Sequence, residues 1–202
     1  MPSKKLEETE YTTLALPSLL DRLQEEGEHG VLDLGLAIGA NVDFFAQFSC
    51  KLYVADLFRA LESRPNQETE EDEDDEEENL WAPVFEELLP YDEGTRFDLI
   101  LAWDLLNYLD RPQIEGLSHR LSQFCHPGTT LLALVSTLKE IPARPRSYHI
   151  LSHDKLLYRT ATRAVRPCPR YKEPDISRWM TAFRVKSTYI LRNGIQEYVF
   201  ST

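Results

Sequence analysis

Short apolar runs alternate with amphipathic stretches along most of the chain. A continuous apolar run is typical of a parallel strand that is covered on both faces, and apolar residues spaced three and four apart indicate a helix. The strand-like runs lie at residues 29–35, 51–56, 97–103 and 129–136. The helix-like patterns lie at residues 14–26, 40–48 and 110–124. The pattern therefore predicts strands and helices that follow one another in turn.

The last part of the chain shows a different pattern. Two apolar runs flank the pair Asn193-Gly194, and an Asn-Gly pair in this position is the strongest local signal for a β-hairpin. Residues 139–174 are rich in Arg, Pro and Tyr and show no clear period, so we expect them to be irregular. Strand–helix alternation through five strands, closed by an antiparallel hairpin, predicts an α/β fold with a doubly wound, mostly parallel seven-stranded sheet.

Two of the eight glycines, Gly35 and Gly39, lie where the first predicted strand turns into a helix. Ligands bind to open α/β sheets at such turns, and glycines there permit positive φ angles and a close approach to the main chain. Asp56 ends the next predicted strand, at a spacing typical of an acid that binds ribose hydroxyls. A plain turn and a helix-capping aspartate would explain each feature separately. Together they favour a nucleoside ligand.

The residues "VLDLGLAIGAN" resemble the first motif of class I S-adenosylmethionine-dependent methyltransferases, in which an acid, here Asp33, precedes the first glycine by two positions. "YVADL" is similar to the ribose-binding motif of that family, and "FEELLPYDEGTRFDLILAWDLLNYL" is similar to its third and fourth strands and the loop after them. "HPGTTLLALVS" resembles its fifth strand and "ILRNGIQEYVF" its terminal hairpin. The likeness extends over roughly residues 29–200. It implies the Rossmann-like fold of that family and S-adenosyl-L-methionine as the cofactor.

The resemblance also implies which residues contact the cofactor. They are Asp33, Gly35, Leu36, Ala37, Gly39, Asp56, Leu57, Glu86 and Trp103. Two positions depart from the family pattern: Ala37 replaces the middle glycine of the turn, and Phe85, with Glu86 beside it, stands where the family often has an acid near the adenine.

A nicotinamide or flavin dinucleotide is the rival ligand. It is less favoured because Asp33 would face a pyrophosphate and because the chain has no second domain for a hydride-transfer substrate.

Methyl transfer from a sulfonium depends on positioning and desolvation, so a general base is needed only when the acceptor is a protonated amine or a weakly acidic hydroxyl. Asp104 follows Trp103 at the end of a predicted strand and is the candidate for orienting or deprotonating the acceptor. Its alternative role is a cap for the helical residues 105–109. The five histidines show no metal-ligand spacing, and no metal site is predicted. The predicted activity is methyl transfer to an oxygen or nitrogen atom.

The net charge of −12 comes largely from one segment. Residues 68–78 hold ten acids and no base, and their mutual repulsion predicts a disordered, solvated insertion at 66–79 within one domain of 202 residues. Residues 142–192 carry twelve Lys or Arg against three acids. Basic residues interleaved with tyrosines suit nucleic acids, but the acidic segment would repel a polyanion. Nucleic acid is therefore disfavoured as a partner, and a small-molecule or protein methyl acceptor is expected.

A catalytically weak or inactive binding module, whose acidic segment recruits a basic partner, remains the alternative. Ala37 and Phe85 favour this alternative, whereas Asp33, Gly35, Gly39 and Asp56 favour the enzyme. The three cysteines are too widely spaced for a disulfide framework, and no apolar run approaches the roughly 20 residues that cross a bilayer. The N-terminal residues lack the apolar core of a signal peptide, so a cytoplasmic location is expected. The sequence does not determine the oligomeric state.

Overall fold

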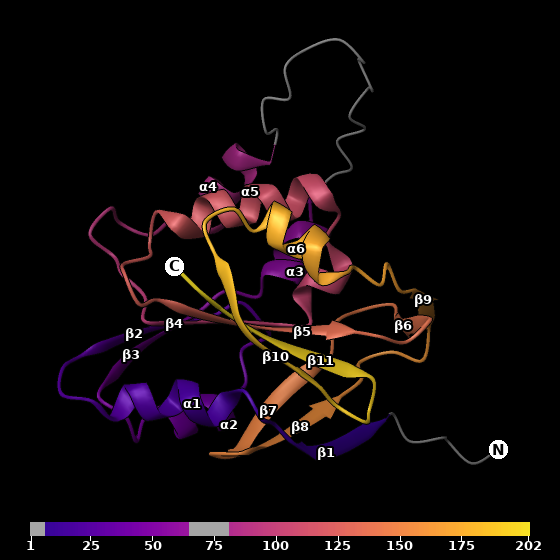
Figure 1. Cartoon of the computed structure of the whole chain (residues 1–202), viewed down its shortest axis with the longest axis horizontal. Coiled ribbons are helices and arrows are strands. Elements are labelled where there is room, and N and C mark those ends of the chain that lie inside the picture. Colours follow the sequence, from indigo (N-terminus) through magenta and orange to yellow (C-terminus); the bar gives the residue numbers. More distant parts are fainter. Residues whose placement is uncertain (1–6, 65–80) are drawn as a thin grey trace, which may run out of the picture.

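The computed structural model of the chain describes residues 7–64 and 81–202. The acidic insertion predicted at residues 66–79 lies outside the described residues. Its disorder and the single-domain organisation therefore stay predictions. The described residues form a layered α/β structure with a central sheet and helices on both of its faces (Figure 1).

The central sheet has six strands among the described residues, in the spatial order β10-β11-β5-β4-β2-β3. Their bounds are β2 (His29–Asp33), β3 (Cys50–Val54), β4 (Leu99–Trp103), β5 (Thr130–Ser136), β10 (Arg184–Ile190) and β11 (Ile195–Ser201). The neighbours β3, β2, β4 and β5 are parallel, whereas β11 is antiparallel to both β5 and β10. The turn between β10 and β11 contains Gly194 at a φ of 81°, as the Asn-Gly signal predicts. The doubly wound sheet with its terminal antiparallel hairpin is confirmed.

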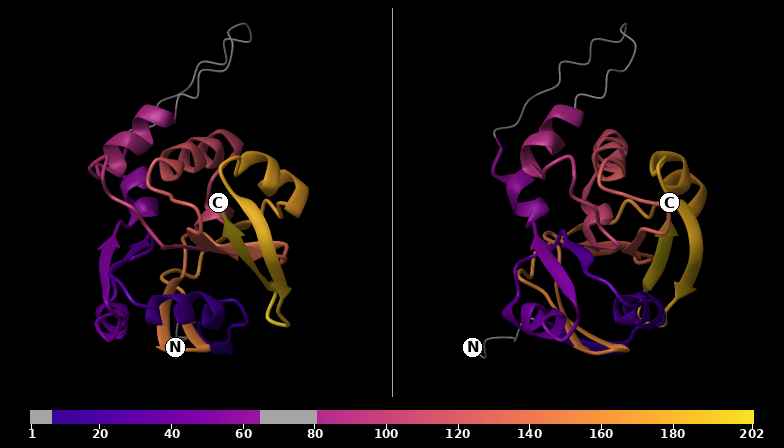
Figure 2. Two further views of the ribbon diagram at one scale, coloured as in Figure 1. Left: turned by 60° about the vertical axis from the view of Figure 1, so that its left-hand side comes forward. Right: turned by 90° about the vertical axis from the view of Figure 1, so that its left-hand side faces the viewer.

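Helices cover both faces of the sheet (Figures 1 and 2). The face drawn uppermost in Figure 1 carries α3 (Leu57–Glu62), α4 (Ala82–Leu88), α5 (Arg111–Ser122) and α6 (Glu173–Trp179). The lower face carries α1 (Leu16–Leu20), the 3-10 turn η1 (Asp21–Gln24) and α2 (Gly39–Phe45). Side chains of a strand point alternately to its two faces, so Ile100 of β4 packs into the upper core while Leu99 and Leu101 pack into the lower core. No helix in the described parts of the chain is long and apolar enough to cross a bilayer.

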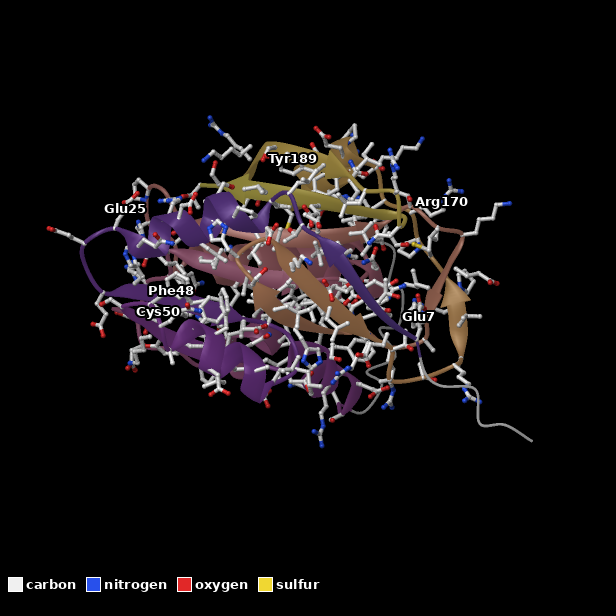
Figure 3. The ribbon with its side chains drawn as sticks, turned by 90° about the horizontal axis from the view of Figure 1, so that it is seen from below. Glu7, Glu25, Phe48, Cys50, Arg170 and Tyr189 are labelled. Carbon is white, nitrogen blue, oxygen red and sulfur yellow. The ribbon has the colours of Figure 1, made fainter. Side chains whose placement is uncertain are left out.

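A second, three-stranded antiparallel sheet lies on the lower side, as the view from below shows (Figure 3). Its strands are β1 (Glu8–Thr12), β8 (Lys155–Arg159) and β7 (Ser147–Ser152), in that spatial order. A separate two-stranded ribbon pairs β6 (Glu140–Pro142) with β9 (Val165–Pro167). The prediction that residues 139–174 are irregular is therefore wrong. Tyr148 and Ile150 alternate along β7 and are both buried, so burial of one strand face against the lower core stabilises strands whose local signal is weak.

The central sheet has one strand fewer than the predicted seven. The missing strand would lie between α4 and β4, but residues 89–98 form no strand. Pro90 cannot donate a hydrogen bond to a strand ladder, and residues 92–94 are exposed and have no apolar face to bury. β3 is consequently the edge strand of the described sheet.

Asn41 fastens α2 to the small sheet. Its buried side chain donates from Nδ2 to the Tyr148 carbonyl and accepts at Oδ1 from the Ile150 N–H, both over 2.9 Å. Because β7 is an edge strand, Asn41 takes the place of a neighbouring strand and satisfies backbone groups that would otherwise be buried without partners. Since α2 directly follows the glycine turn, the contact also fixes that turn relative to the small sheet.

We predict that Asn41→Ala destabilises the protein by about 2–4 kcal/mol, because it leaves two buried backbone groups unpaired at about 1–3 kcal/mol each. Asp43→Ala, on an exposed position of the same helix, is the matched control and should change the free energy of unfolding by less than about 0.5 kcal/mol. Urea unfolding of both variants is the measurement. Equal, small effects of the two substitutions would show that Asn41 does not hold α2 to β7.

Candidate functional site

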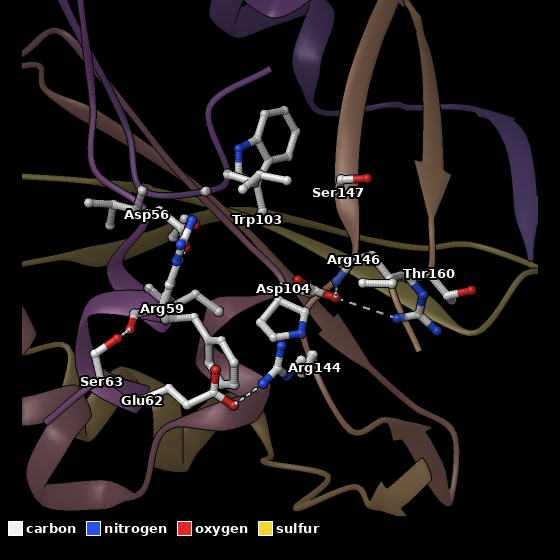
Figure 4. Close-up of a pocket in the computed structure, with 18 residues that line it drawn as sticks. Asp56, Arg59, Glu62, Ser63, Trp103, Asp104, Arg144, Arg146, Ser147 and Thr160 are labelled. Atoms are coloured by element: carbon white, nitrogen blue, oxygen red, sulfur yellow. Dashed lines mark hydrogen bonds and ion pairs between the residues drawn. The ribbon is translucent and has the colours of Figure 1, made fainter. Parts of the chain in front are cut away.

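A cavity of about 510 Å³ lies at the carboxyl ends of β2 and β4, where the predicted ligand site was placed (Figure 4). Its volume falls within the range of about 300–1,000 Å³ that small-molecule sites occupy. The lining residues that matter below are Gly35, Leu36, Asp56, Arg59, Glu62, Trp103, Asp104, Arg144, Arg146 and Thr160. A second hollow, of about 670 Å³, is lined by residues of η1, α2 and the β7–β8 turn and contains none of the predicted ligand contacts.

Trp103, the last residue of β4, has an unusual backbone. The register of β4 against β5 shifts between Leu101 and Trp103, and Trp103 adopts a φ of 46°. A positive φ is strained for a bulky side chain and persists only where the surroundings enforce it. The surroundings here are tight: the indole is buried and stacks on the Tyr148 ring, with an interplanar angle of 2° and 5.3 Å between ring centroids. The shift in register therefore directs Trp103 into the space between the glycine turn and the small sheet.

Gly35 is required by this tryptophan. A Cβ at position 35 would lie 2.7 Å from Trp103 Cδ1, a distance that side-chain carbons do not tolerate. Neither Gly35 nor Gly39 adopts a positive φ, so the conformational freedom expected of these glycines is not used. Gly39 differs from Gly35, because no described atom lies within 4 Å of the position that its Cβ would take. The close approach of Trp103 thus explains why residue 35 is a glycine. Gly39 lies beside open space within the described protein, and no protein contact explains it.

Asp33 connects the turn to Trp103. Its Oδ1 accepts hydrogen bonds from the Gly35 N–H over 2.9 Å and from Trp103 Nε1 over 2.6 Å. Burial raises the pKa of the Asp33 carboxyl to about 6, because these donors offset only part of the desolvation. Asp33 is 2% exposed and does not line the cavity. Asp33 instead stabilises the cavity wall, because its hydrogen bonds hold Gly35 and Trp103, which do line the cavity.

Asp56 both caps a helix and lines the cavity. Its side chain caps α3 by accepting from the Arg59 N–H over 3.3 Å, and the same residue lines the cavity. The capping role that the sequence left open is therefore present, and the carboxylate stays partly exposed toward the cavity.

Asp104 is buried at the cavity wall beside Arg146. Its side chain makes no capping bond to the 3-10 turn η2 (Leu105–Tyr108). Oδ2 instead accepts from the Arg146 backbone N–H over 3.2 Å and lies 3.5 Å from Arg146 Nη1, while Oδ1 has no hydrogen-bond partner among the described residues. Burial raises the pKa of Asp104 to about 6, and the neighbouring guanidinium lowers it in part.

The other predicted contacts lie away from the cavity lining. Ala37 is exposed in the turn, and Gly39 is the first residue of α2. Leu57 is buried in the upper core. Glu86 is exposed on α4, and its neighbour Phe85 is buried in the upper core. The cofactor contacts of these residues stay predictions.

Sequence reasoning missed the wall opposite Asp56. Arg146, Ser147 and Thr160 form this wall from the two ends of the β7–β8 hairpin (Figure 4). The available signal was the apolar residue at every second position, Tyr148 and Ile150 in β7 and Leu156 and Tyr158 in β8. Residues 146, 147 and 160 belong to the Arg- and Lys-rich stretch 142–192, so this stretch forms one wall of the cavity. Across residues 7–64 and 81–202, no three His, Cys, Asp or Glu side chains come together as metal ligands.

A sequence profile described as a methyltransferase domain matches residues 9–183 of the chain. The chain belongs to the methyltransferase-domain family. A search of curated proteins gave no match. An S-adenosylmethionine-dependent methyltransferase from Clostridium acetobutylicum has a similar structure, with a TM-score of 0.52 and 11% identity over 92% of this chain and 90% of that chain. A 1,6-didemethyltoxoflavin-N1-methyltransferase from Burkholderia thailandensis gives a TM-score of 0.48 and 15% identity, over 94% of this chain and 78% of that chain. The predicted fold class and the resemblance to this family are confirmed.

We predict that Gly35→Ala destabilises the protein by about 1–3 kcal/mol, because the added methyl overpacks the contact with Trp103. The same change in a Trp103→Ala background should cost clearly less, because the ring is gone and only Asp33 Oδ1, at 3.1 Å, remains close to the added methyl. Gly39→Ala, which adds a methyl in open space, is the matched control and should stay within about 0.5 kcal/mol of its parent. Urea unfolding of wild type, the two single variants and the double variant gives the coupling between positions 35 and 103. An equal cost of Gly35→Ala in both backgrounds would contradict the steric explanation.

Proposed function

We propose that this chain is an S-adenosylmethionine-dependent methyltransferase that transfers a methyl group to an oxygen or nitrogen atom of a small molecule or a protein. The cavity carries this proposal: at the carboxyl edge of a methyltransferase-type sheet it brings together the glycine turn, an acid that ends the neighbouring strand and a buried carboxylate. Family membership and the fold support it. Binding of S-adenosylmethionine and a screen of hydroxyl and amine compounds as acceptors test it.

The predicted cofactor contacts divide between the turn and the end of β3. We expect Asp56 to accept hydrogen bonds from the ribose hydroxyls, and its partial exposure and its position in the cavity lining support this role. Gly35 and Leu36 line the cavity beside it. Asp33 contributes by fixing the Gly35 N–H and the Trp103 indole, which keeps this wall in one conformation before a ligand binds.

Asp104 suits the role of a base for the acceptor. When bound, the cofactor supplies an activated methyl group whose transfer leaves a neutral thioether. An acceptor hydroxyl or ammonium must lose a proton as it is methylated, and a carboxylate at the cavity wall can take that proton. With a pKa of about 6, Asp104 is deprotonated at neutral pH and is a stronger base than an ordinary aspartate. The binding-module alternative is favoured by Ala37 and Phe85, and the acidic segment through which it would recruit a partner lies outside the described residues.

We predict that Asp56→Ala weakens S-adenosylmethionine binding by about 1.5–3 kcal/mol, which is about 10- to 150-fold, because charge-assisted hydrogen bonds to the ribose are lost. The substitution also removes a helix cap, so Asp110→Ala, which removes the cap of α5 away from the cavity, is the matched control. Calorimetric titration of both folded variants separates the two effects. Unchanged affinity in Asp56→Ala would remove Asp56 from the site.

We predict that kcat/KM falls about tenfold per pH unit below pH 6, because protonation of Asp104 removes the base. In Asp104→Asn the rate at pH 8 should fall by about 10²- to 10⁴-fold and the acidic limb should vanish. Asp33 has a similar pKa, so Asp33→Asn is the control and should keep the limb. The pH profiles are measured with the best acceptor from the screen. An acidic limb that persists in Asp104→Asn would assign it to another group.

A further inference from the structure

Arg146 is a buried cation at the cavity wall. It precedes β7, its side chain is only 9% exposed, and it lines the cavity with Ser147 and Thr160. Figure 4 shows these residues across the cavity from Asp56 and Arg59. A buried guanidinium is costly unless its charge and its N–H groups find partners. The contacts of Arg146 therefore show whether the protein itself satisfies this group or leaves donors for a ligand.

The protein holds the Arg146 guanidinium in place but leaves most of its donors unused. The group lies over the Tyr158 ring, 4.9 Å from the ring centroid, and this cation–π contact stabilises it there. Its one ion-pair contact joins Nη1 to Asp104 Oδ2 over 3.5 Å, which is long for a charge-assisted hydrogen bond, and the same oxygen also accepts from the Arg146 backbone N–H. Nε has no hydrogen-bond partner in the described part of the chain. A guanidinium carries five N–H donors, so the contact with Asp104 does not satisfy the group.

The other two arginines of the cavity differ from Arg146. The Arg144 guanidinium pairs with Glu62 over 2.9 Å, and both side chains are about half exposed (Figure 4). Arg59 is exposed on α3. Of the three, only Arg146 combines burial, a contact with an aromatic ring and unused donors. Because Asp104 already offsets part of its charge, the cavity wall suits a monoanion better than a dianion.

We propose that Arg146 binds the carboxylate of a small-molecule methyl acceptor, which makes the acceptor a hydroxy or amino carboxylic acid. The planar fork of an arginine matches the two oxygens of a carboxylate. Asp104 lies beside the anchored group, so a hydroxyl or amine of the same molecule is held near the base. This inference rests on the proposed function, because the acceptor shares the cavity with the cofactor. The carboxylate of the cofactor is the rival source of the same chemistry.

The test begins with two cofactor analogues. S-adenosylhomocysteine carries the amino-acid carboxylate, whereas 5′-methylthioadenosine lacks it. Calorimetry of wild type and Arg146→Gln with both compounds should show affinities that change less than threefold between the proteins. A tenfold or larger loss for S-adenosylhomocysteine alone would assign Arg146 to the cofactor carboxylate and overturn the proposal. If wild type binds neither compound, the proposed function itself fails.

The second step uses acceptor probes on protein saturated with S-adenosylhomocysteine. The probes are glycolate, 3-hydroxybutyrate, salicylate, 4-hydroxybenzoate and 4-aminobenzoate, each paired with its primary amide. At least one carboxylate should bind wild type tenfold or more tightly than its amide, and Arg146→Gln should abolish the preference. Arg166→Gln is the matched control, since Arg166 also lies over a tyrosine ring, that of Tyr108, but does not line the cavity. It should keep the preference.

Two results would overturn the proposal at this step. One is the absence of any carboxylate preference in wild type, and the other is a preference that persists in Arg146→Gln. Phenyl phosphate is included because a dianion that binds more tightly than every carboxylate would contradict the charge argument. If Arg146→Gln shows no cooperative thermal transition, Arg146→Lys replaces it, because it keeps the charge beside Asp104. That variant should reduce the preference, since an ammonium lacks the planar fork.

Discussion

The left-handed backbone of Trp103 is the constraint on which the site depends. A strand that ended with ordinary geometry would not direct this indole toward the glycine turn. As it is, one side chain contacts Gly35, donates to Asp33 and stacks on Tyr148. Three segments that are distant in sequence therefore meet at one ring. The strain at this residue is offset by a buried hydrogen bond and a stacked aromatic pair.

The lower layer builds the far wall of the cavity because Trp103 and Asn41 both bind β7. Asn41 pairs with the backbone of β7, and Trp103 stacks on its Tyr148 side chain. The β7–β8 hairpin is thereby held against the carboxyl edge of the central sheet, and its ends supply Arg146 and Thr160. Two carboxyls lie in contact with these residues, Asp33 with Trp103 and Asp104 with Arg146. Both have pKa values near 6 because they are buried. Buried acids oppose folding at neutral pH, and such costs are concentrated at functional sites.

The parallel strands and the final hairpin could be predicted because their signals are local. The apolar run of β4 and the pair Asn193-Gly194 each specify an element without knowledge of the rest of the chain. The small sheet was missed because the turn between β7 and β8 contains no glycine, and β1 gains its place only by pairing with β8, more than 140 residues away. The seventh strand was predicted from the family resemblance, but Pro90 cannot donate to a strand ladder and residues 92–94 are exposed.

Part of the candidate site could likewise be predicted from the sequence, and part could not. The glycine turn, Asp56 and Asp104 were found because strand ends gather at one edge of a parallel sheet. The reason for Gly35 could not be found, because the ring that requires its missing Cβ lies 68 residues further along the chain. Arg146 could not be distinguished from its basic neighbours either. Its burial depends on the Tyr158 ring and on Asp104, which only the folded chain brings together.

The central claim is that the cavity beside Trp103 binds the nucleoside ligand. Amide hydrogen exchange with and without S-adenosylhomocysteine tests this claim directly, because it reports the binding place without a mutation. The account predicts slower exchange at residues 34–37, 56–59 and 102–105. It predicts no change at residues 96–98 and 126–129, at the opposite ends of the strands. Protection confined to those opposite ends, or to the hollow between η1 and the β7–β8 turn, would contradict it.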